Sequence, residues 1–150
     1  RWEAGMLGSI QAALPRVASD RFFILHADMP LVPSSAFGIL YDASLGRGPG
    51  AGGRAGNLGG SAGGRARAAS SADQEAGVPL FASFRGEAGH PVLVPSTLID
   101  GILGLDPAGR LRPFLMERGG RLVDCGNRAV LADLDSRLDY EQALSERSIE

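Results

Sequence analysis

The fold is constrained most by a run of four large apolar residues, Phe22 to Leu25. The run is too short for a helix and does not alternate with polar residues, so it predicts a central parallel strand covered on both faces. Segments with helical spacing flank it on either side. Ser9 is expected to cap a helix over residues 10–17, and a second helix is expected over residues 34–42.

Strand and helix patterns continue to alternate in the second half of the chain. Further strands are expected at residues 78–84, 91–95, 121–125 and 129–131. Further helices are expected to begin at residues 96, 111 and 136. This alternation predicts one α/β domain over residues 1–150, with a Rossmann-like open, mostly parallel mixed sheet and helices on both faces.

Residues 46–77 interrupt this pattern, because they consist mainly of glycine, alanine, serine and arginine. Such a segment cannot bury enough apolar surface to offset its ordering entropy, so we expect a flexible surface insertion. Its arginines would suit RNA, but it has no aromatic residues on which bases could stack. Nucleic acid is therefore not an expected partner.

Composition excludes several other classes of protein. The formal net charge of -2 gives no electrostatic reason to bind nucleic acid or a membrane. No apolar run approaches the roughly 20 residues that span a bilayer, and no signal peptide is visible. The single Cys125 cannot form an intrachain disulfide and is expected to be a small core residue. These features fit a reducing cytoplasm.

Three acidic residues in two segments are candidates for metal binding. Asp28 directly follows the first predicted strand, where open α/β sheets place their ligands, and carboxylates are natural ligands of Mg²⁺. On position alone, a metal ligand and a simple turn before Pro30 are equally good interpretations. Asp133 and Asp135 lie on one side of an extended chain and could join Asp28, although a helix-start role for Asp135 is favoured on this evidence.

The two histidines carry little information by themselves. Gly89, His90 and Pro91 form a tight turn that enters a strand, and a lone histidine in that position is more often structural than catalytic. His26 is expected to pack in or near the core. The chain shows no nucleophile–base triad and no zinc-ligand spacing.

Together these segments resemble the MobA-like nucleotidyltransferases, and most closely the molybdenum cofactor cytidylyltransferase group. The four similar stretches occur in the family's order and are Gly5–Ile10, Leu25–Val32, Gly89–Leu93 and Leu131–Ser136, the last followed by Asp139 and Tyr140. Leu111–Leu115 is a looser match. The resemblance covers nearly the whole chain apart from residues 46–77.

The resemblance implies transfer of a nucleoside monophosphate from an NTP, with CTP favoured, to a phosphorylated acceptor such as molybdopterin, with release of pyrophosphate. It implies that Asp28 and Asp135 are catalytic and hold Mg²⁺. The residues implied for nucleotide binding are Gly5, Ser9 and Asp28, and those implied for the acceptor are Gly89, His90 and Pro91.

One part of the family pattern has no counterpart in this sequence. The family's opening strand and glycine-rich loop, whose arginine and lysine hold the triphosphate, are not found, and all 15 basic residues here are arginine. We therefore expect this chain alone to bind NTP weakly and to turn over little. Two alternatives stay open: a sugar-phosphate or other small-acceptor nucleotidyltransferase of the same fold, and a non-catalytic remnant that acts as a binding domain.

Overall fold

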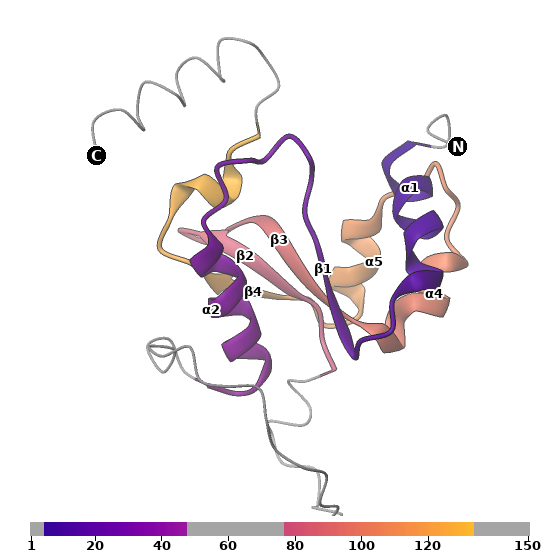
Figure 1. Cartoon of the computed structure of the whole chain (residues 1–150), viewed down its shortest axis with the longest axis horizontal. Coiled ribbons are helices and arrows are strands. Elements are labelled where there is room, and N and C mark those ends of the chain that lie inside the picture. The colour runs from indigo at the N-terminus through magenta and orange to yellow at the C-terminus, as the bar shows by residue number, and fades with distance from the viewer. Residues whose placement is uncertain (1–4, 48–76, 134–150) are drawn as a thin grey trace, which may run out of the picture.

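The computed structural model describes residues 5–47 and 77–133, which form a mixed sheet with helices on both faces (Figure 1). The described residues contain four strands in the order β1-β3-β2-β4. These strands are β1 (Arg21–Ile24), β2 (Leu80–Phe84), β3 (Glu87–Pro95) and β4 (Arg121–Asp124). The predicted α/β class is confirmed.

The sheet is mixed and not mostly parallel, which corrects the expectation from sequence. β3 is antiparallel to both β1 and β2, whereas β2 and β4 are parallel. The cause is the two-residue turn between β2 and β3, in which Arg85 and Gly86 both have positive φ, 51° and 83°. Turns of this kind match the twist of an antiparallel hairpin. β1, β2 and β4 therefore point the same way, and their carboxyl ends share one edge of the sheet.

β1 is not the central strand that its apolar run predicted. In the described part of the chain it lies at the end of the sheet and pairs with β3 alone. Its apolar residues are divided between two surroundings: Phe22 and Ile24 are partly buried, whereas Phe23 is 36% exposed. The Phe23 ring makes an edge-on contact with Phe37, with 5.0 Å between ring centroids.

Among the described residues, four helical segments follow the predicted positions with shifted ends. They are α1 (Gly5–Ala13) with η2 (Leu14–Arg16), α2 (Ser34–Ser44), η3 (Ser96–Leu98) with α4 (Ile99–Leu103), and α5 (Leu111–Glu117). Ser9 is not the cap of the first helix, because it lies inside α1 and its hydroxyl donates to the Gly5 carbonyl oxygen at 3.4 Å. α5 ends at the predicted point, where Gly119 adopts a φ of 83°.

Residues 129–131 do not form the predicted strand. They belong to a 3₁₀ helix, η4 (Arg128–Leu131), which Asn127 caps by accepting a hydrogen bond from the Ala129 N–H at 2.8 Å. Gly126, with a φ of 64°, turns the chain out of the sheet just before it. The last predicted helix and residues 48–76 of the predicted insertion lie outside the described residues.

The sheet separates two apolar cores. One contains α1, α4 and α5 packed on Phe81, Val92 and Val94, and the other contains α2 and η4 packed on Leu80, Ala82 and Leu93. Strand residues alternate between the two because successive side chains of a strand point to opposite faces. In the described part of the chain, no helix is long and apolar enough to cross a membrane.

Candidate active site

Asp28 lies in a turn directly beyond the carboxyl end of β1. The turn is fixed by a hydrogen bond from the Met29 N–H to the His26 carbonyl oxygen, at 3.3 Å, and by the buried Met29 side chain. Asp28 itself is exposed, and its carboxylate has no hydrogen bond or ion pair to another described residue. A rigidly held loop thus presents an unengaged carboxylate at this edge of the sheet.

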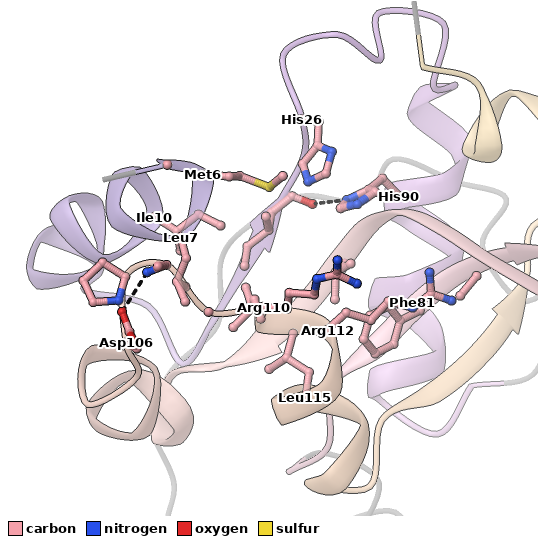
Figure 2. A pocket seen from close by; sticks show the side chains of 18 of the residues that line it. Met6, Leu7, Ile10, His26, Phe81, His90, Asp106, Arg110, Arg112 and Leu115 are labelled. Atoms are coloured by element: carbon pink, nitrogen blue, oxygen red, sulfur yellow. Dashed lines mark hydrogen bonds between the residues drawn. The ribbon is translucent and has the colours of Figure 1, made fainter. Parts of the chain in front are cut away.

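His26 and His90 meet beside this loop. Their ring centroids are 3.9 Å apart, and His90 Nδ1 lies 3.4 Å from the Ile24 carbonyl oxygen (Figure 2, dashed line). Because a carbonyl oxygen can only accept, Nδ1 of His90 carries the hydrogen, and Nε2 of the neutral ring is left as an acceptor. The register of β1 and β3 favours the contact: the last printed pair is Ile24 with Val92, and His26 and His90 each lie two residues beyond it on the same side.

Burial lowers the pKa of His90 below its ordinary value of 6.5. The neighbouring His26 lowers this pKa further and Arg112 acts in the same direction, while the hydrogen bond to Ile24 and the Asp28 carboxylate oppose the shift. Desolvation and nearby positive charge both disfavour imidazolium. His90 is therefore neutral at pH 7.

A large cavity of about 770 Å³ lies between α1, α5 and the sheet. Its walls are mainly apolar, and its polar side chains are His26, His90, Asp106, Arg110 and Arg112 (Figure 2). Volumes of roughly 300–1,000 Å³ with apolar walls and a few polar groups are typical of small-molecule sites. The cavity has the size of a ligand and the polar groups to orient one.

A second hollow, the β1 groove, has a volume of about 630 Å³ and runs between α1 and β1 to Asp28. Ser9 and Asp28 border this groove, and neither borders the large cavity. The two hollows share a wall made by Met6, Ile10, Ile24 and His26. Two ligands bound in them would therefore be immediate neighbours.

Comparison with known protein families gives one match, the MobA-like NTP transferase domain, over residues 1–122. The match covers most of the chain, including Asp28 and the His90 strand. The chain belongs to this family. Membership implies that the MobA-like domain is a nucleotidyltransferase that uses an NTP. A search of curated proteins finds no matching relative.

The structure divides the sequence-predicted residues of the MobA-like domain between the two hollows. Ser9 and Asp28 lie on the β1 groove, whereas Gly5, Gly89 and His90 lie on the large cavity. Pro91 is fully buried in β3 and borders neither hollow. Asp135 lies outside the described residues and beyond the family match, while Asp133 is described and exposed.

The donor set at Asp28 suits a hard divalent cation. Members of the MobA-like family typically use Mg²⁺, which takes one or two carboxylates and otherwise retains water or phosphate oxygens. No group of three or more His, Cys, Asp or Glu side chains within metal-binding reach occurs among residues 5–47 and 77–133. A single exposed carboxylate fits Mg²⁺ shared with a substrate, and it does not fit a metal held by protein ligands alone.

Sequence reasoning missed three side chains of the large cavity. His26, which is half-buried, forms part of the cavity wall, a role not assigned to it from sequence, and Arg110 and Arg112 had no assigned role. Two-residue spacing from Ile24 to His26 would indicate a shared side if the chain stays extended just beyond the end of β1. The arginines give no comparable signal, because their position depends on how the loop before α5 folds over the sheet.

Proposed function

We propose that this MobA-like domain transfers a nucleoside monophosphate from an NTP, with CTP favoured, to a phosphorylated acceptor of the molybdopterin type. An oxygen of the acceptor phosphate forms a bond to the α-phosphorus of the NTP, and the bond from that phosphorus to the pyrophosphate oxygen breaks. The observation that carries the proposal is the pair of adjoining hollows, one ending at Asp28 and the other lined by His90. The preference for CTP and molybdopterin rests on the similarity of the sequence motifs.

We assign the nucleotide to the β1 groove. Asp28, with Asp135 as its partner, would hold Mg²⁺ there, and the bound ion would neutralise charge on the triphosphate. Ser9, which belongs to α1, offers a hydroxyl from the α1 wall of the groove. Met6 and Ile10 border both hollows and give the boundary between the two proposed substrates an apolar side.

We assign the acceptor to the large cavity. Neutral His90 can accept a hydrogen bond from the acceptor through Nε2 while its Nδ1–H remains on Ile24. Its lowered pKa holds that form at pH 7 and avoids a charged ring that would have to be desolvated. Reaction then depends on positioning the acceptor phosphate against the α-phosphorus, and positioning contributes much of the rate in phosphoryl chemistry.

Titration calorimetry of the chain with millimolar CTP, GTP, ATP and UTP, with and without Mg²⁺, tests the nucleotide assignment. We expect binding to require Mg²⁺, CTP to bind most tightly, and Asp28→Asn to lower the affinity about tenfold or more. Asp124→Asn is the matched control, since Asp124 ends the parallel strand β4 and an asparagine keeps the oxygen that accepts from Gly126 N–H. Equal binding by Asp28→Asn and the wild type would overturn the assignment.

A further inference from the structure

The two positively charged side chains that line the large cavity, Arg110 and Arg112, have no part in the proposed function as described so far. Arg110 and Arg112 come from the loop before α5 and the first turn of that helix, and both line the cavity (Figure 2). Among the described residues, neither guanidinium has a hydrogen bond or an ion pair. Other arginines differ: Arg47 pairs with Asp42 at 3.6 Å, and Arg118 lies 4.9 Å from the centre of the Phe114 ring.

The one carboxylate on the cavity wall does not neutralise this pair. Asp106 Oδ1 accepts a hydrogen bond from the Ala108 N–H at 2.9 Å, and the Gly109 N–H donates to the Asp106 carbonyl oxygen at 2.7 Å. Asp106 is thus used to close the turn that carries Arg110. The cavity keeps a local excess of positive charge although the whole chain has a net charge of -2.

The rest of the cavity is apolar and too large for a bare anion. Ile10, Phe81, Val92 and Leu115 line it, and its volume is about 770 Å³. Planar guanidinium groups match phosphate oxygens in pairs, and apolar walls favour a ring or chain attached to the phosphate. The ligand chemistry that satisfies both parts is an organic phosphomonoester with an apolar or heteroaromatic ring.

We propose that Arg112, assisted by Arg110, binds the phosphate of the acceptor in the large cavity and thereby selects a ring-bearing phosphomonoester. The assignment to the acceptor rests on the proposed transferase function. The two arginines would then bind the acceptor phosphate, while Asp28 would bind the nucleotide through its metal ion. Arg112 is also close enough to His90 to act on it electrostatically, so the phosphate and the His90 ring would share one environment.

The test uses phenyl phosphate, with inorganic phosphate as the ring-free probe, in NMR titrations of the whole chain. We expect phenyl phosphate to bind more tightly than inorganic phosphate, and Arg112→Gln to weaken it about tenfold, the loss of a charge-assisted contact. Arg118→Gln is the matched control, because Arg118 follows the same helix and does not line the cavity. We expect this control to bind phenyl phosphate as the wild type does.

A parallel titration with Mg²⁺ and CTP separates this inference from the proposed function. We expect Arg112→Gln to bind CTP with unchanged affinity, and an equal loss for CTP and phenyl phosphate would overturn the assignment to the acceptor. Unchanged binding of phenyl phosphate by Arg112→Gln would overturn the anion site while leaving Asp28-dependent CTP binding intact. If neither the wild type nor either variant binds CTP, but phenyl phosphate binding still depends on Arg112, the transferase function would be overturned and the anion site would stand.

Discussion

The two faces of the sheet differ in how completely their helices cover it. On the face of α2 and η4, the η4 backbone lies directly against β3, so that a side chain at Gly89 would overlap the Val130 carbonyl group. On the face of α1, α4 and α5, the same strand presents His90 to a cavity of about 770 Å³. The Gly89 backbone also borders this cavity, but a side chain added at Gly89 would point to the closed face, whereas the His90 side chain points to the cavity.

Under the proposed function, this difference separates a structural face from a ligand-binding face. Where η4 packs against β3, close packing stabilises the domain and leaves no room for a substrate. The other face has less coverage and collects the histidine pair and both cavity arginines.

The largest effect on stability is expected from truncating the closed face. Leu40→Ala in α2 should reduce the free energy of unfolding by about 3 kcal/mol, because Leu40 is fully buried and the space it leaves cannot collapse. Ile10→Ala on the cavity wall should reduce it by less than about 1 kcal/mol, since Ile10 already lacks neighbours on one side. Urea denaturation of both variants measures the difference, and equal losses would remove the contrast between the faces.

A somewhat smaller loss is expected at the closest approach on the closed face. Gly89→Ala should cost about 2 kcal/mol, because the added methyl group forces η4 away from β3. Gly38→Ala in α2 is the control, since nothing lies within 4 Å of the added carbon there, and it should stabilise by about 0.5–1 kcal/mol. Thermal denaturation reports both, and a neutral Gly89→Ala would show that η4 is not held against β3.

The ligand-binding face should show a pH dependence that the closed face lacks. The folded-state pKa of His90 is below the ordinary value of 6.5, so the unfolded chain binds the extra proton first as the pH falls. The contribution of His90 to stability is therefore complete above pH 6.5 and is lost as the pH falls toward the lowered pKa. Urea denaturation between pH 5 and 8 should show this slope in the wild type and a reduced slope in His90→Asn, whereas identical slopes would contradict the assignment.

The smallest effect concerns Cys125, which packs against the core of the closed face. Burial raises the pKa of its thiol, so little thiolate is present at neutral pH. Alkylation by iodoacetamide at pH 7.5 should be several-fold slower in the folded chain than in urea. Equal rates would indicate that this edge of the closed face is open to solvent.

Local pattern in the sequence was enough to predict most elements but not their partners. The run Phe22–Leu25 predicted a strand, yet its central position was wrong, because strand order depends on contacts between distant segments. The strand predicted at residues 129–131 is a 3₁₀ helix, because the Asn127 cap and the turn at Gly126 outweigh a three-residue apolar pattern. The hairpin turn at Arg85 and Gly86 shows how two residues reversed the expected sheet type.

The candidate site was predictable where it follows a strand. Asp28 follows a predicted strand, whereas His90 lies within β3 and reaches the same edge of the sheet because β3 is antiparallel to β1, which the sequence did not predict. The contact between His26 and His90 requires the register of β1 against β3, and the arginines require the fold of the loop over residues 106–110. Neither the strand register nor the loop fold can be predicted from a short motif. The pairing of Asp28 with Asp135 stays a prediction.

The central claim is that substrates bind on the face of α1 and α5 and not on that of α2 and η4. The most direct measurement is a ¹H–¹⁵N NMR titration of the chain with CTP and Mg²⁺, which detects weak binding residue by residue. We predict shifts concentrated in residues 26–28, in Ser9 and in the shared wall at Ile10, with no comparable shifts in α2 or η4. Shifts concentrated in α2 and η4, with residues 26–28 unchanged, would contradict the account.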